Sequence, residues 1–137
     1  MSASLKINED INQALQEAIE YRKNGEFDNA ILVYQKLIQI QPKNPDFYDK
    51  IAQNQAQKGD FSEAIKNYKQ AVSLGIKNPI WTYKNLGDAL REENRLEEAE
   101  STYLQAVTIN SNNPFVYDCL GQIQAQQGKF SEAIENY

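Results

Sequence analysis

The side chains that most often perform acid–base or nucleophilic chemistry are scarce in this chain. It contains no histidine, which is the commonest general acid or base in enzymes. Its single cysteine, Cys119, has no histidine to activate it, so we interpret it as a packing thiol and not as a nucleophile. The same scarcity leaves no histidine–cysteine cluster for a transition metal. We therefore predict no catalytic residue, no metal and no cofactor.

Acidic pairs and isolated glycines are the remaining candidates for chemistry. The glutamate pairs at 92–93 and 97–98 lie in stretches with helical periodicity, where a solvated outer face explains them better than a catalytic pair does. Gly87 and Gly121 stand singly inside predicted helices, unlike the glycine-rich loops that cradle phosphates. These residues indicate a binding protein and not an enzyme.

Charge and composition exclude several partners. The chain has 137 residues and a formal net charge of −5, whereas nucleic-acid binding needs a concentrated basic surface. No polybasic cluster or long apolar run indicates a membrane, and the first residues lack the apolar stretch of a signal peptide. A lone cysteine is typical of a reducing compartment. We predict a cytoplasmic protein that binds neither nucleic acid nor a membrane.

One stretch recurs along the chain and determines its organisation. The segment that begins Gly59-Asp-Phe-Ser-Glu-Ala-Ile returns at Gly128, and looser copies begin at Gly25 and Asn94. The four copies start 34, 35 and 34 residues apart. Self-similarity at such a period predicts stacked helical repeats.

Apolar periodicity, glycine and proline divide the chain into repeats. After a polar leader at residues 1–10, in which Asn8 or Asp10 would cap the first helix, repeats are predicted at 11–44, 45–79, 80–113 and 114–137, the last one truncated in its second helix. One extra residue is predicted within 79–83. Short connections between helices require antiparallel neighbours, so we expect seven full helices and a partial eighth. The apolar side of that eighth helix, with Ala133, Ile134 and Tyr137, has no following helix. We therefore predict either fraying of its last turn or an end-to-end contact between two copies of the chain.

Aligning the copies shows small and large residues at fixed places. Small residues allow the helix backbones to approach, and large ones fill the space between them. The recurring sets are Ala30, Ala64, Ala99 and Ala133; Ala18, Ala52, Gly87 and Gly121; and Tyr34, Tyr68, Tyr103 and Tyr137.

These residues resemble the tetratricopeptide repeat (TPR) family, whose pattern places aromatic residues, a Leu-Gly pair and alanines at fixed offsets. The third copy matches at Tyr83, Leu86-Gly87, Ala99, Tyr103 and Ala106, and the resemblance covers residues 11–137. It implies an all-α solenoid of antiparallel helix pairs in a right-handed superhelix, with three and a half to four repeats. It also implies a binding face that the first helices of the pairs form on the concave side.

The family pattern assigns inward-facing positions to this chain. In the first copy they are Asn12, Leu15, Ile19, Arg22 and Lys23. The candidate peptide-binding residues are Asp49, Gln53, Trp81, Lys84, Asp88, Arg91, Phe115, Asp118 and Gln122. Chaperone-binding members use a clamp of Lys, Asn, Asn, Lys and Arg at positions that hold Leu15, Ile19, Lys50, Trp81 and Asn85 here, so the carboxylate clamp is absent.

Three functions are compatible with this pattern. The first is a protein–protein interaction module that binds a peptide or partner segment on the concave face. The second is the N-terminal arm of a larger enzyme, such as a glycosyltransferase or methyltransferase. The third is a self-assembling scaffold. The identity of the partner and the presence of a domain after Tyr137 lie outside what the sequence determines.

Overall fold

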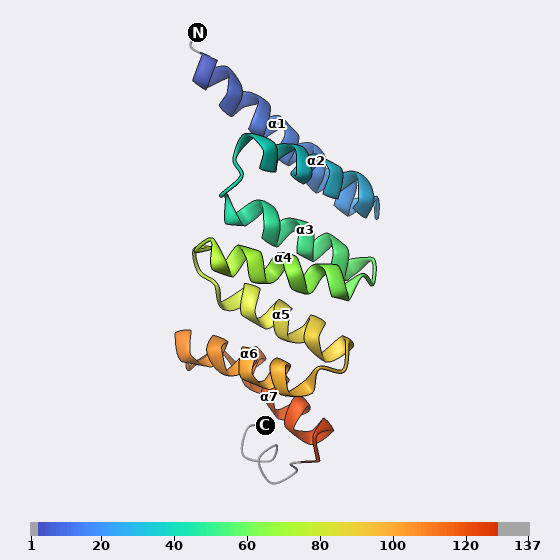
Figure 1. Ribbon diagram of the computed structural model, residues 1–137, viewed down its shortest axis with the longest axis vertical. Coiled ribbons are helices and arrows are strands. Elements are labelled where there is room, and N and C mark those ends of the chain that lie inside the picture. The colour runs from blue at the N-terminus through green and yellow to red at the C-terminus, as the bar shows by residue number, and fades with distance from the viewer. Residues whose placement is uncertain (1–2, 129–137) are drawn as a thin grey trace.

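The computed structural model describes residues 3–128, which form seven α-helices stacked along one axis (Figure 1). The helices are α1 (Ala3–Lys23), α2 (Phe27–Ile40), α3 (Pro45–Gln57), α4 (Phe61–Ser73), α5 (Ile80–Glu92), α6 (Leu96–Ile109) and α7 (Pro114–Gln126). Each helix packs against the next, and α5 also contacts α3 on one side and α7 on the other. The predicted all-α solenoid is confirmed. The eighth helix and the end-to-end contact predicted through Ala133, Ile134 and Tyr137 lie outside the described residues.

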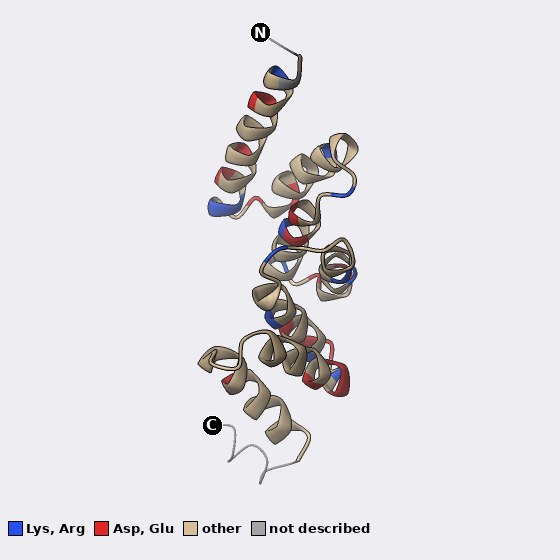
Figure 2. Ribbon diagram, turned by 90° about the vertical axis from the view of Figure 1, so that its left-hand side faces the viewer, with Lys and Arg blue, Asp and Glu red and all other residues tan. Residues whose placement is uncertain are grey.

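The first helix begins much earlier than predicted. Residues 3–10 are helical, so the prediction of a leader that precedes the first helix is wrong for them, and Asn8 and Asp10 lie inside α1. Neither glycine nor proline interrupts this segment, and extending an existing helix avoids the cost of nucleation. Figure 2 shows α1 diverging from its neighbours toward the N-terminus.

The turns within the repeats share one geometry. After α1 the backbone N–H of Glu26 donates to the carbonyl of Tyr21 at 2.8 Å, and that of Gly25 donates to Arg22 at 3.0 Å. This pair of bonds is a Schellman motif, which needs one residue with positive φ. Gly25 has a φ of 76°, and in the third repeat the equivalent residue Asn94 has a φ of 60°, because asparagine tolerates the left-handed region.

The helices α3, α5 and α7 have 13 residues each. Asn44 and Asn113 cap α3 and α7 by accepting backbone N–H bonds, each followed by a proline in the first turn. In the third repeat Pro79 precedes the helix, which begins at Ile80. The extra residue therefore lengthens the linker and leaves the register of α5 unchanged.

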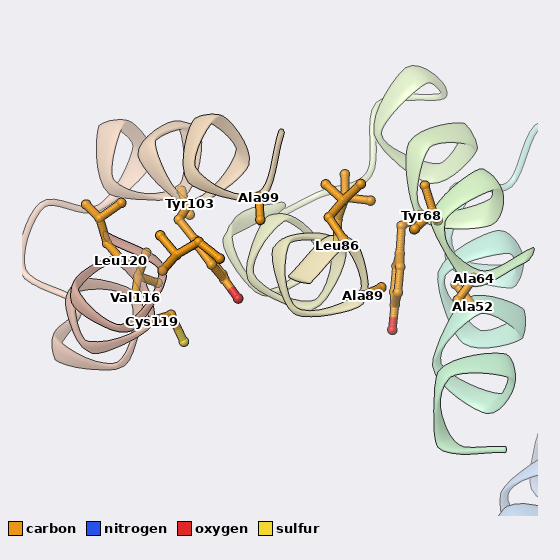
Figure 3. Packing of buried hydrophobic residues seen from close by; sticks show 14 residues of the cluster. Ala52, Ala64, Tyr68, Leu86, Ala89, Ala99, Tyr103, Val116, Cys119 and Leu120 are labelled. Atoms are coloured by element: carbon orange, nitrogen blue, oxygen red, sulfur yellow. The ribbon is translucent and has the colours of Figure 1, made fainter. Parts of the chain in front are cut away.

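The interior interlocks alanines with tyrosines. Ala64 and Ala99 are fully buried, and Tyr68 and Tyr103 are almost as inaccessible. Figure 3 shows Tyr68 beside Ala89 of α5, and Tyr103 between α5 and α7. A Cβ atom built on Gly87 would lie 2.5 Å from the Tyr103 ring, so this position in α5 requires the smallest residue.

Two hydrophobic clusters share the chain and meet on α3. Ile51 belongs to the cluster formed with α1 and α2, and the adjacent Ala52 belongs to the cluster that extends to α7. Between residues 3 and 128, no helix is both long and apolar enough to cross a membrane.

Candidate functional site

The positions mapped as inward-facing lie on α1, α3, α5 and α7, and we call this surface the groove face. Its N-terminal end is a pocket of about 730 Å³ among α1, α2 and α3. The apolar lining of the pocket consists of Ile11, Leu15, Ile19, Tyr34 and Phe47. Its charged lining consists of Arg22, Lys23, Lys50 and Asp46. Below, these nine residues are called the N-terminal pocket.

Arg22 links the N-terminal pocket to α3. Its Nη1 donates to Oε1 of Gln53 at 2.9 Å, and its Nε donates to Oε1 of Gln57 at 2.7 Å. Gln53 in turn donates from Nε2 to Oδ2 of Asp49 at 2.8 Å. Both partners of the guanidinium are neutral amides, so its positive charge is oriented without being neutralised.

The same chain of hydrogen bonds occurs two repeats further along. Nη1 of Arg91 donates to Oε1 of Gln122 at 2.8 Å, and Nε2 of Gln122 donates to Oδ2 of Asp118 at 3.0 Å. Each residue occupies the repeat position of its counterpart in the first network. Repetition of this contact holds the polar side chains of the groove face in defined orientations.

A second, polar hollow adjoins the N-terminal pocket. It has a volume of about 260 Å³, and Arg22 and Gln57 line both cavities. Its other lining residues come from α3, α4 and α5 and include Tyr68, Asn85 and Asp88. The two cavities thus lie next to each other on the groove face, with Arg22 and Gln57 at their shared boundary.

Asp88 is the centre of a compact cluster on α5. Its Oδ2 pairs with Nζ of Lys84 at 2.6 Å, and its Oδ1 accepts from the hydroxyl of Tyr103 at 2.5 Å. The Cys119 thiol lies 3.9 Å from the same Oδ1. Burial and the Asp88 charge raise the pKa of Cys119, which keeps the thiol protonated at neutral pH.

Two aromatic residues form an exposed pair at the C-terminal end of the groove face. Trp81 and Phe115 are each the second residue of their helix, and their ring centroids are 6.3 Å apart. The side chains are 50% and 65% exposed. Asp46 is the second residue of α3 and lines the N-terminal pocket. The second residues of α3, α5 and α7 therefore form a row that runs from the N-terminal pocket to the aromatic pair.

Asp49 differs from the other predicted binding residues because it is buried. Its Oδ1 accepts from Thr82 at 3.0 Å, and Oδ2 accepts from Gln53. Burial raises the pKa of its carboxyl group, and the bonds from Thr82 and Gln53 oppose the rise. Since both oxygens have partners, Asp49 orients Gln53 and connects α3 with α5.

The sequence reasoning missed the most enclosed part of the face. Leu15 and Ile19 were mapped as inward-facing, but neither they nor Ile11, Phe47 and Lys50 were among the candidate binding residues. One signal was present: the first copy has two aliphatic residues where the third has Lys84 and Asp88. An aliphatic pair at positions expected to face a groove indicates an apolar binding surface.

The described residues contain no constellation that would favour catalysis. Over residues 3–128, no group of three or more His, Cys, Asp or Glu is placed to hold a metal ion. The Cys119 thiol contacts a carboxylate instead of a base that would activate it.

Comparison with known proteins gives consistent matches. A family model described as "TPR repeat" matches residues 18–59 and 87–128, and a "Tetratricopeptide repeat" model matches residues 45–74. A TPR repeat-containing protein of Methanocaldococcus jannaschii, MJ1428, is 26% identical over 94% of this chain and 23% of its own length. This chain spans between 17% and 37% of the length of the curated relatives it matches.

Solved structures show the same architecture. A crystal structure of MamA protein superposes with a TM-score of 0.86 at 25% identity, covering 95% of this chain and 70% of that one. The first TPR of Spaghetti (RPAP3), bound to an HSP90 peptide, has a TM-score of 0.76 at 25% identity and covers 86% of this chain and 95% of its own. With its repeats, its interlocked alanines and tyrosines and the two matching family models, the chain belongs to the tetratricopeptide repeat family.

Proposed function

We propose that this chain is a protein-interaction module that binds an extended segment of a partner protein along the groove face. The observation that carries the proposal is the pair of adjacent cavities, the N-terminal pocket and the polar hollow, with Arg22 lining both of them. Beyond the hollow lies the exposed pair of Trp81 and Phe115. A row of cavities and aromatic surface suits an extended chain better than a compact small molecule.

The chemistry of the face supports binding with modest affinity. Arg22 and Arg91 are held by neutral glutamines, which leaves further N–H groups to donate to a ligand. The exposed aromatic residues offer apolar contact, and buried aromatic contacts dominate many interfaces. Because four short repeats offer a limited surface, we expect dissociation constants on the order of micromolar. The first TPR of Spaghetti, a similar structure, is bound to a peptide, which supports a peptide as the ligand.

The experiment selects peptides from a phage-displayed library of random 12-residue sequences and measures the binding of the enriched peptides by fluorescence anisotropy. Trp81→Ala should weaken binding by about fivefold or more, because truncating an interface hot spot removes over about 1 kcal/mol. The double variant Lys84→Ala/Arg91→Ala should weaken it as well, since both cations lie on one face of α5.

The matched control is Leu104→Ala on α6. Leu104 is 47% exposed, close to the value for Trp81, but lies on a helix outside the groove face. Its truncation should leave binding unchanged. Binding that depends on Leu104 and not on Trp81, Lys84 or Arg91 would place the interaction elsewhere, and failure to enrich any peptide would contradict the proposal.

A further inference from the structure

The chain contains two versions of one arrangement, and the first of them lies beside an apolar pocket. Arg22, Gln53 and Asp49 repeat as Arg91, Gln122 and Asp118 with the same donors and acceptors. Beneath these networks the two repeats diverge. The shared hydrogen bonds belong to the repeat fold, whereas the residues that differ are particular to the N-terminal pocket.

The divergence concerns the residues between the paired helices. Leu15 and Ile19 of α1 correspond to Lys84 and Asp88 of α5. In the third repeat these two positions hold the Lys84–Asp88 ion pair, and the Asp88 carboxylate also accepts from the Tyr103 hydroxyl. In the first repeat Leu15 and Ile19 line an open cavity together with Phe47 and Tyr34. Ile19 remains 42% exposed, although burying an aliphatic side chain is favourable.

The charge around this apolar surface is positive within an acidic chain. Arg22, Lys23 and Lys50 line the N-terminal pocket against a single carboxylate, Asp46, although the whole chain carries −5. Within residues 3–128, neither Arg22 nor Lys50 forms an ion pair. Lys23 lies 4.0 Å from Glu20, and both side chains are 69% exposed, so that contact screens little of its charge.

The position of Arg22 brings this charge next to the apolar lining. Burial raises the pKa of the Tyr34 hydroxyl in the pocket, and the field of Arg22 opposes the rise. Arg22 and Gln57 also line the neighbouring hollow. A ligand side chain in the pocket would therefore have cationic groups beside the ligand's own backbone and flanking residues.

We propose that the N-terminal pocket takes a bulky aliphatic or aromatic side chain from an internal peptide segment whose flanking residues are acidic. This rests on the proposed function and adds the chemical class of the segment. The apolar side chain covers Leu15, Ile19 and Phe47, while carboxylates beside it pair with Arg22, Lys23 and Lys50. No terminal carboxylate is required, because Leu15 and Ile19 occupy positions that would need polar groups to clamp one.

Three synthetic ten-residue probes with blocked termini test the inference. Each carries a central Leu-Phe pair, flanked by glutamates, glutamines or lysines. The glutamate probe should bind at least about fivefold more tightly than the glutamine probe, and the lysine probe most weakly, because charge complementarity discriminates between ligands. A fourth probe, with glutamates around a central Ala-Ala pair, should bind at least about fivefold more weakly than the glutamate probe with Leu-Phe. Equal binding of all four probes overturns the proposal.

Two variants locate the site. Leu15→Lys/Ile19→Asp copies the ion pair already present at Lys84 and Asp88 and should abolish preference for the Leu-Phe centre. Lys23→Gln/Lys50→Gln changes two exposed side chains and should reduce binding of the glutamate probe by about fivefold or more. Lys66→Gln/Lys69→Gln on α4 is the matched control, because it removes the same charge from two exposed lysines outside the pocket.

The outcomes distinguish this inference from the proposed function. If library-selected peptides bind through Trp81 but are indifferent to all the pocket variants, the groove function stands and the pocket assignment is wrong. If Lys23→Gln/Lys50→Gln and the α4 control reduce the affinity for the glutamate probe equally, the attraction is a general charge effect and the pocket assignment is also wrong. Loss of binding in Lys23→Gln/Lys50→Gln alone, with the circular dichroism spectrum unchanged, supports it.

Discussion

At the scale of single residues, the groove face depends on carboxylates that have different roles. Asp118 is exposed, whereas its counterpart Asp49 is buried and accepts bonds from Thr82 and Gln53. Asp88 pairs with Lys84 and accepts from Tyr103. Equivalent repeat positions thus carry a ligand-accessible group in one repeat and a group that fixes its neighbours in another.

The first prediction at this scale concerns Asp49 and pH. Burial raises the pKa of its carboxyl group above the usual 3.8, so between the two values the folded chain binds more protons than the unfolded chain. The contribution of Asp49 to stability is therefore largest at low pH and falls as the pH rises. Asp49→Asn lacks this dependence, so its stability relative to the wild type should improve as the pH rises from about 3 to about 7.

Urea unfolding of both proteins at each pH and constant ionic strength provides the measurement. The difference between the two unfolding free energies cancels the titration of the other carboxylates. A difference that is constant across the range, or that moves in the opposite direction, would show that the Thr82 and Gln53 bonds outweigh burial.

At the scale of elements, the helices α3, α5 and α7 have the same length, and their corresponding residues face the groove. Their close packing on the second helices of the repeats sets the separation of the groove residues. Gly87 is the tightest such contact described, because the Tyr103 ring lies where its Cβ would be. The hydroxyl of the same tyrosine bonds Asp88 on the groove face, so packing and site geometry are linked there.

We therefore expect Gly87→Ala to destabilise the protein. A helical Gly→Ala change by itself stabilises by up to about 1 kcal/mol, but overpacking a core costs about 1–3 kcal/mol. The net loss should be about 1 kcal/mol, measured by urea unfolding. In a Tyr103→Leu background the ring is absent, and the same substitution should become neutral or stabilising. Equal losses in both backgrounds would show that the ring is not the cause.

At the scale of the whole molecule, stability comes from neighbours along the stack. The two hydrophobic clusters meet on α3, one with α1 and α2 and the other reaching α7. The main contacts between helices in the described part of the chain join adjacent and next-but-one helices. Such a solenoid behaves as a nearly one-dimensional array, in which a local change is felt mainly by adjoining repeats.

A matched pair of core substitutions tests this behaviour. Ile31→Val removes a methylene from the cluster of α1–α3, and Ile123→Val removes one from the cluster that reaches α7; each should cost about 0.5–1.5 kcal/mol. Hydrogen exchange should accelerate most in α1 and α2 for the first variant and in α6 and α7 for the second. Uniform acceleration across the chain in both would indicate a single cooperative unit.

Within residues 3–128, the sequence alone determined the repeat period, the pairing of the helices and the buried alanines and tyrosines. These features follow from local rules, because glycine and proline end helices and an apolar stripe must be covered by the next helix. The same local rules placed the start of the first helix too late, because residues 3–10 lack the apolar periodicity that predicts a packed helix. Helix propagation from the packed residues beyond them explains why α1 includes this segment.

Only the tertiary structure decided what the groove face offers to a ligand. From the sequence, Trp81, Phe115 and Asp49 were all candidate binding residues. The structure paired the two rings, buried Asp49 under Thr82 and enclosed the N-terminal pocket between α1 and α3. Exposure, pairing and enclosure depend on the distance and angle between helices. Those quantities are set jointly by side chains from neighbouring repeats, which no single stretch of the sequence specifies.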